Sequence, residues 1–297
     1  MHETLNNSNL NPQEIERAIK GQKADFPNGI PECGTDALRY GLLAYTVQGR
    51  DINLDIKRIE GYRNFCNKLW NAIKFTIMNL GPNFKPNTSS KILTSAESKW
   101  DLWILSIVWQ TTKLVDSAFV EYRFADLTEI LYDFWLYKFC NTYLESIKPV
   151  ISREKKNPDA ANAARQTLYT VVDVGLRLLH PLMPFITEEL YQRLPRRSTL
   201  TDPPSICVTP YPVVEQYTEF GRNEPLEKEI EFVNKILHDI RSLRSEYNLA
   251  KKQVKLYLRF DDNNGLLEKM EPYLDTIQVC CSICLKEFYC FFCTCSF

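Results

Sequence analysis

Apolar residues recur at intervals of three and four along most of this 297-residue chain, which predicts a protein built mainly from amphipathic helices. The clearest stripe runs from Tyr62 to Leu80, and polar and basic residues occupy its opposite face. Helical hairpins with such faces assemble into an up-and-down bundle, so we expect a mainly all-α fold. Further helices are predicted over residues 12–21, 35–45, 98–119, 125–147, 158–179, 185–194 and 225–247.

Capping and helix-breaking residues set the expected ends of these helices. Ser95 or Ser98 is predicted to cap the helix that ends near residue 119. Asn157, followed by Pro158, is the expected start of the helix over 158–179. The helix over 125–147 should stop before Pro149, and the helix over 158–179 should break near His180, because proline removes a backbone donor. Residues 195–225 are predicted to form an irregular loop with an extended piece at 205–209.

The pattern changes after Leu249. Apolar and polar residues alternate from Val254 to Phe260, which is typical of a strand, and residues 266–278 could form a helix packed on it. One strand cannot stand alone, so we expect the beginning of a truncated α+β unit. The chain is therefore divided into residues 1–60, 61–250 and 251–297.

Charge is distributed unevenly, although the net charge is only −1. Residues 50–74 contain six basic and three acidic side chains, and residues 235–255 contain six basic and two acidic ones. Such segments could simply be solvated helix faces. They are also the places where a near-neutral chain could bind RNA through local charge.

Basic and amide side chains in these two segments are the predicted RNA ligands. Arginine and lysine neutralise phosphates, and amides can read base edges. The five tryptophans are expected in the core rather than on bases, because most lie on or beside apolar stripes. The predicted RNA-binding residues are Arg50, Arg58, Arg63, Asn64, Lys68, Asn71, Arg241 and Arg244.

Several long motifs resemble one protein family. GRDINLD (49–55), GYRNFCNKLWNA (61–72) and HPLMPFITEELYQRLP (180–195) are similar to the part of eukaryotic valyl-tRNA synthetases, class I enzymes, that follows the catalytic domain. GTDALRYGL (34–42) and RSLRSEYNL (241–249) add to the resemblance, which runs from about residue 5 to 249. Isoleucyl enzymes share the layout. The resemblance implies a stem-contact segment over 1–60 and a helical anticodon-binding domain over 61–250.

In that family these parts grip tRNA while an absent domain attaches valine to tRNA(Val) with ATP and Mg. The resemblance thus implies the tRNA-binding portion of a ligase of protein biosynthesis, with tRNA(Val) and other translation components as partners. No His-Ile-Gly-His or Lys-Met-Ser-Lys-Ser motif, Walker A loop or Gly-x-Gly-x-x-Gly occurs in the sequence. We therefore expect a fragment with no catalytic residue and no cofactor of its own, unable to make valyl-adenylate alone. The alternatives are a catalytically silent protein-interaction module and a nonfunctional truncation product.

Other features change this interpretation little. The sequence has neither a long uncharged apolar window nor a signal peptide, so we expect a cytoplasmic protein without membrane or DNA as partner. Two Cys-x-x-Cys pairs, at Cys281 and Cys290, could hold zinc, but the five residues between them are too few for a zinc ribbon. We interpret 279–297 as an aberrant tail and expect no metal. His180 is expected to be packed, and the three histidines suggest no nucleophile–base pair.

Overall fold

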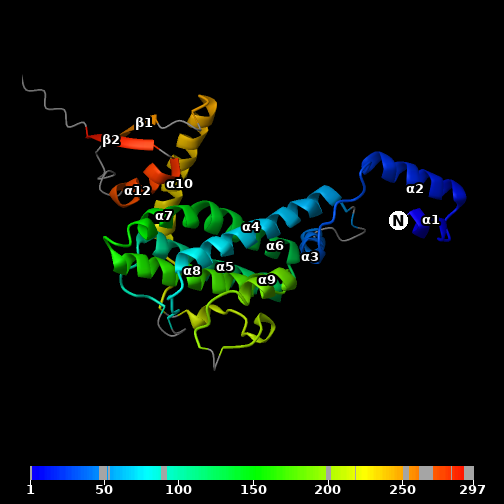
Figure 1. Ribbon diagram of the computed structural model, residues 1–297, viewed down its shortest axis with the longest axis horizontal. Coiled ribbons are helices and arrows are strands. Elements are labelled where there is room, and N and C mark those ends of the chain that lie inside the picture. Colours follow the sequence, from blue (N-terminus) through cyan, green and yellow to red (C-terminus); the bar gives the residue numbers. More distant parts are fainter. Residues whose placement is uncertain are drawn as a thin grey trace, which may run out of the picture.

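The computed structural model describes residues 2–46, 52, 54–87, 92–198, 202–217, 219–249, 254–260, 270–281 and 283–290. For residues 2, 254–260, 279–281 and 283–290 the backbone alone is described. Long helices lie side by side in a bundle, and this confirms the mainly all-α fold expected from the apolar periodicity (Figure 1).

Three long helices form the body of the bundle: α4 (Ile56–Leu80), α5 (Lys99–Val120) and α8 (Pro158–Leu179). Each begins at a side chain that accepts a backbone N–H of the first turn, which replaces a missing intrahelical bond. Ser98 forms a full capping box with Asp101, and Asn157 accepts from the amide of Ala160. Of the two predicted caps, Ser98 is the one used.

The helix start predicted near Tyr62 is wrong by six residues. Helix α4 begins at Ile56, where the Asp55 carboxylate accepts the amide of Lys57. The predicted division between residues 60 and 61 therefore falls inside one continuous helix. Helix α3 (Thr35–Ala44) also packs in the bundle, since Tyr40 is fully buried and its hydroxyl donates to the carbonyl of Thr128 at 2.5 Å.

The predicted helix over 125–147 consists of three pieces: α6 (Phe124–Asp133), the π-helical segment η1 (Phe134–Tyr143) and α7 (Leu144–Ser152). Pro149 does not stop it, because α7 continues to Ser152 with the proline ring buried. Burial of that ring offsets the loss of one backbone donor. In η1 the side chains of Trp135, Phe139 and Tyr143 are all fully buried.

The core is centred on Trp135 and on aliphatic side chains of α4, α5, α6 and α8. Helices α8 and η1 approach closely at Gly175, where a Cβ atom would lie 2.7 Å from Trp135 Cζ2. A larger residue at this position would force the two elements apart. The largest fully buried side chains include Trp135, Tyr40, Tyr143, Phe134, Phe139, Leu69, Ile73, Ile104 and Leu127.

Helix α9 (Pro184–Tyr191) follows a break after Leu179, as predicted from the two prolines. The loop beyond it contains two 3₁₀ turns, η2 (Ile206–Val208) and η3 (Val214–Gln216), so the extended piece expected at 205–209 is wrong. The Ser205 side chain accepts from the amide of Cys207 and favours the turn.

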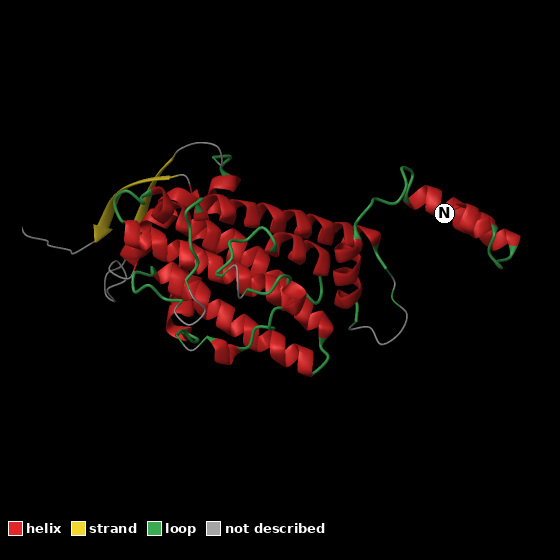
Figure 2. Cartoon of the chain, turned by 60° about the horizontal axis from the view of Figure 1, so that its bottom comes forward, coloured by secondary structure: helices red, strands yellow, loops and turns green. Residues whose placement is uncertain are grey.

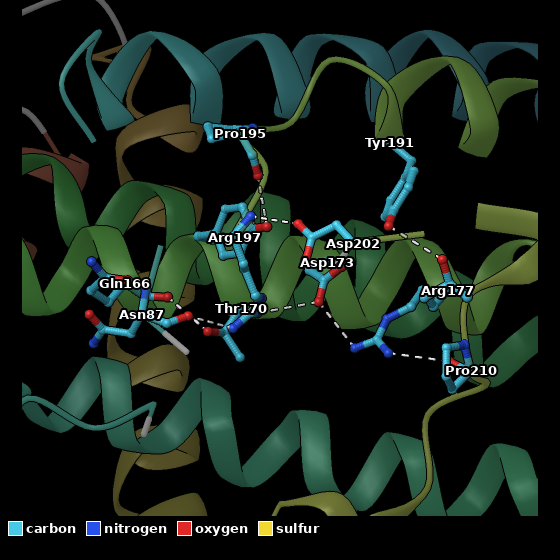
Figure 3. A network of polar contacts seen from close by, with 12 residues as sticks. Asn87, Gln166, Thr170, Asp173, Arg177, Tyr191, Pro195, Arg197, Asp202 and Pro210 are labelled. Carbon is cyan, nitrogen blue, oxygen red and sulfur yellow. Dashed lines mark hydrogen bonds and ion pairs between the residues drawn. The ribbon is translucent and has the colours of Figure 1, made fainter. Parts of the chain in front are cut away.

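An ion-pair network fastens this loop to α8 (Figure 3). Asp173 accepts from Arg177 at 3.1 Å and from Arg197 at 3.4 Å. The two guanidinium groups also donate to backbone carbonyls, of Pro210 and Asn87 respectively. The carboxylate therefore joins segments that are far apart in the sequence.

The two ends of the chain differ in how they are attached. Helices α1 (His2–Asn6) and α2 (Pro12–Asp25) lie apart from the bundle, and α2 has no buried residue (Figure 2). Helix α10 (Glu224–Glu246) packs on α5 through Ile230, Val233 and Leu237. After it, β1 (Val254–Phe260) confirms the predicted strand, and it pairs in parallel with β2 (Ile283–Cys290). The 3₁₀ turn η4 (Glu271–Tyr273) and α12 (Leu274–Cys281) lie between them.

Candidate nucleic-acid interface

A cleft rich in tyrosine opens between α3, α4, α6 and η1, with a volume of about 360 Å³. The ring of Tyr132 lies edge-on between those of Tyr62, at 6.4 Å, and Tyr137, at 6.3 Å. The side chain of Tyr137 is half exposed, at 51%. Exposed aromatic rings are platforms on which unpaired bases can stack. The cleft is lined by Tyr40, Ala44, Arg58, Gly61, Tyr62, Thr128, Glu129, Tyr132, Asp133 and Tyr137.

A second cleft of about 260 Å³ adjoins the first, because Tyr137 lines both. It lies between η1 and α10, and its lining includes Lys138, His238 and Arg241. The buried Nε1 of Trp100, which also lines this cleft, has no acceptor among the described residues. The lining is completed by Asn141, Thr142, Asn234, Leu237 and Thr276.

Lysine and amide groups connect α4 to the second cleft. Lys68 Nζ donates to Asn141 Oδ1 over 3.3 Å, and Asn141 lines the cleft with Arg241. The two predicted basic segments, on α4 and α10, therefore flank η1 on the same side of the bundle. Phosphates could be neutralised here next to aromatic rings, which is the combination that single-stranded RNA requires.

The predicted residues of α4 do not all share this side. Asn64, Lys68 and Asn71 are exposed and follow one another at intervals of four and three, so they lie on one face of the helix. The Arg58 guanidinium lies over the Tyr45 ring at 4.6 Å and lines the first cleft. Arg63 is on another flank, where it donates to the carbonyl of Glu32.

Arg244 differs most from the expectation. It is only 8% exposed, and its Nη2 donates to the carbonyl of Leu249 at 3.1 Å, just beyond the end of α10. A basic side chain at this position satisfies carbonyl groups at the helix end. Burial leaves too little of the guanidinium for a phosphate, so the structure argues against Arg244 as an RNA ligand. Arg50 lies outside the described residues.

Sequence reasoning missed most of the cleft. Tyr62, Tyr132, Tyr137, Lys138 and Asn141 were not expected to form a site. An α-helical projection from 125 to 147 turns Tyr132 away from Tyr137, and Tyr62 lies on another helix, α4. The π-helical segment changes that rotation by widening the turn. The spacing of five between Phe134 and Phe139, both buried, was the available signal.

Two other expectations are that the chain holds no metal ion and contacts no membrane. Within the described part of the chain, no cluster of His, Cys, Asp and Glu could hold a metal ion, and no helix is long and apolar enough to span a bilayer. The side chains of the two Cys-x-x-Cys pairs lie outside the described residues, so the expectation about zinc stays a prediction.

Comparison with known proteins gives this surface a context. The family model described as the anticodon-binding domain of tRNA ligase matches residues 101–258, more than half of the chain. A valine–tRNA ligase of Takifugu rubripes is 52% identical over 283 residues, which are 94% of this chain and 23% of the relative. The Homo sapiens valine–tRNA ligase is 52% identical over 263 residues, 88% of this chain and 20% of the relative.

A mitochondrial valine–tRNA ligase of Mus musculus is also similar, at 41% identity over 93% of this chain. The expected cytoplasmic location therefore stays a prediction. The chain spans about a quarter or less of the length of these curated relatives, at 20 to 25%. The match of the family model to residues of α5, α6, η1, α7, α8, α9 and α10 covers both walls of the second cleft. The chain belongs to the family of anticodon-binding domains of tRNA ligases.

Proposed function

We propose that this chain is the tRNA-binding portion of a valine–tRNA ligase, and that the two clefts joined at Tyr137 hold the anticodon loop of tRNA(Val). The observation that carries this proposal is the meeting of tyrosine rings with Lys68, Lys138 and Arg241 on one side of the bundle. The family match and the names of the relatives support RNA as the ligand of these clefts.

Each component of the clefts has a distinct role in the proposal. Tyr137, which is half exposed, offers a ring on which an unpaired base can stack. Arg241 and Lys138 neutralise phosphates of the loop, and Asn141 can read a base edge. In a full-length enzyme this grip would support ATP-dependent attachment of valine to the tRNA.

Two substitutions test the clefts by titration with tRNA(Val) and with a tRNA of different anticodon. Tyr137→Ala should weaken binding of tRNA(Val) by about 1–3 kcal/mol, the usual contribution of one stacked base. The weakening should be much smaller for the second tRNA if base stacking in the loop is specific. Equal and undiminished affinity of Tyr137→Ala for both tRNAs would count against the first cleft as the binding site.

Arg241→Ala should weaken binding of both tRNAs and lower the slope of log K against log salt by about 1, because one phosphate contact is lost. Lys228→Ala is the matched control, since Lys228 is exposed on the same helix α10 but thirteen residues away, about 20 Å along the axis. Equal effects of the two substitutions would mean that general positive charge, not the second cleft, binds the RNA.

The same preparation tests the expected inactivity of the chain alone. Valine-dependent exchange of pyrophosphate into ATP should be absent, because the sequence contains neither ATP-binding motif of class I enzymes. Indifference to all tRNAs, together with a stable complex with another protein, would instead favour a catalytically silent interaction module.

A further inference from the structure

Two side chains from different elements contact the two ring nitrogens of His180. His180 directly follows α8, and its Nδ1 lies 2.7 Å from Thr187 Oγ1 on α9. Its Nε2 lies 3.2 Å from the Sγ atom of Cys207, in the turn η2. The sequence spacing of 27 residues between the histidine and the cysteine hid this pair from sequence reasoning.

The hydrogen bonds of Thr187 determine which nitrogen of the imidazole carries the proton. Thr187 Oγ1 donates its only hydrogen to the backbone carbonyl of Met183 at 2.7 Å. It must therefore accept a hydrogen bond from His180, so the neutral ring is protonated on Nδ1. The lone pair of Nε2 then faces the thiol of Cys207, which donates to it. This is the arrangement of a nucleophile, a base and a group that orients the base.

We propose that Cys207 is a reactive thiol, activated by His180, and that it is a site of mixed-disulfide formation with small disulfides such as glutathione disulfide. In the step, Cys207 Sγ passes its proton to His180 Nε2 and attacks one sulfur of the disulfide. A new S–S bond forms, the old one breaks, and the departing thiolate takes the proton from His180. Cys207 is oxidised, and half of the small disulfide is reduced to a thiol.

The accessible position of Cys207 separates it from the other cysteines whose side chains are described. Cys207 is exposed, whereas Cys33, Cys66 and Cys140 are half-buried. Burial raises the pKa of the Cys66 and Cys140 thiols to about 11, so these thiols stay protonated near neutral pH. They serve as internal references of low reactivity in the same molecule.

The groups around His180 suit it to act as a base. Burial lowers the pKa of the imidazole, which leaves it neutral and able to accept a proton at pH 7, while the carboxylates of Glu188 and Asp36 act in the opposite direction. The guanidinium of Arg39 is nearby, donating to the carbonyls of Pro181 and Leu182. The carbonyl end of α8 favours the imidazolium that forms when the thiol loses its proton.

A second set of contacts holds the thiol in position. The Glu188 carboxylate on α9 accepts from the Ser205 hydroxyl at 2.8 Å and from the amide of Ile206 at 3.0 Å. Since Ser205 Oγ also accepts from the amide of Cys207 at 3.1 Å, the turn that carries the thiol is fixed to the helix that carries Thr187. The geometry is therefore built by the fold and does not depend on a flexible side chain.

The test is the rate at which each cysteine of the full chain reacts with glutathione disulfide between pH 6 and 9, followed by mass spectrometry of tryptic peptides. The peptide 198–222 contains Cys207 as its only cysteine. Wild-type Cys207 should react faster at pH 7 than Cys33, Cys66 and Cys140. His180→Gln should slow it about tenfold or more at this pH, since removal of a general base costs at least that much, and less at pH 9.

Substitutions at Thr187 distinguish activation from simple exposure. Thr187→Val removes the group that orients the imidazole and should slow Cys207, whereas Thr187→Ser keeps the hydroxyl and should restore the wild-type rate and pH profile. Circular dichroism would verify that each variant is folded. Equal rates and pH profiles of Cys207 in wild type, His180→Gln and Thr187→Val would overturn the proposal. No RNA is involved, so the outcome is independent of the proposed function.

Discussion

At the scale of single residues, the carboxyl group of Asp101 is inaccessible to solvent and therefore needs hydrogen-bond donors inside the protein. It accepts from the Tyr143 hydroxyl at 2.6 Å and from the amide and hydroxyl of Ser98. Burial raises the pKa of Asp101, and the hydrogen bonds from Ser98 and Tyr143 oppose that rise. The same carboxylate that caps α5 thus fixes η1 against it.

Tyr143→Phe should lower the free energy of unfolding by about 1.5–3 kcal/mol at pH 7, the usual loss for a hydrogen bond to a charged group. The loss should shrink at acidic pH. Because the folded-state pKa of Asp101 is raised, the folded protein takes up this proton first as the pH falls, and the carboxyl then needs its donor less. Urea unfolding at pH 7 and at pH 4.5 would measure both values, and a loss that grows toward acid would contradict the argument.

How far single residues could be predicted depended on whether their surroundings are local. Ser98 and Asn157 were identified as caps because a cap is read from residues three positions apart. The burial of Arg244 and its bond to the carbonyl of Leu249 could not be read from the sequence, because they depend on how the chain folds beyond the helix end. The pair of His180 and Cys207 was missed because only the fold brings α8 and η2 together.

At the scale of elements, two glycines in long helices have opposite surroundings. A Cβ atom on Gly175 of α8 would lie 2.7 Å from Trp135 and 3.0 Å from Phe134, whereas one on Gly61 of α4 would meet nothing within 4 Å. Alanine favours helix at both positions by about 0.5–1 kcal/mol. The effects of alanine at the two positions should therefore differ only through packing against neighbouring side chains.

Gly175→Ala should therefore destabilise the protein by about 1–3 kcal/mol, the common result of overpacking a core. Gly61→Ala is the matched control and should stabilise it by up to about 1 kcal/mol. Thermal unfolding followed by circular dichroism would report both. A stabilised Gly175→Ala variant would show that η1 can shift away from α8 without loss.

Most helices were predicted within a few residues, because each carries a regular apolar stripe that must face a core. The exceptions are the start of α4, which lies six residues before the predicted one, and the π-helical segment η1 (Phe134–Tyr143), which changes the phase of the stripe. That change also explains why the candidate site was only partly anticipated: the basic residues of α4 and α10 were identified, but the tyrosines between them were not. The different rotation of η1 hid the position of Tyr137, which lines both clefts.

At the scale of the whole molecule, the bundle and the first two helices differ in how much they bury. Helix α2 has no buried residue, and the segment after it contacts α4 through the carbonyl of Glu32, which accepts from Arg63. Helix α3, by contrast, buries Ala37 and Tyr40 almost completely. Residues 1–60 therefore contain two parts. Helices α1 and α2 lie outside the bundle and α3 is packed in it, with the division close to Gly34.

Removal of residues 1–33 should thus leave the unfolding midpoint of the bundle within about 2 °C of its original value, since exposed residues contribute little. Removal of residues 1–54 is the matched deletion, because it also takes away α3, the fully buried Tyr40 and its bond to the carbonyl of Thr128. Loss of one such aromatic costs about 3–5 kcal/mol, which should lower the midpoint by more than about 6 °C. Thermal scans of both deletions would check this, and equal midpoints would show that α3 is not part of the cooperative unit.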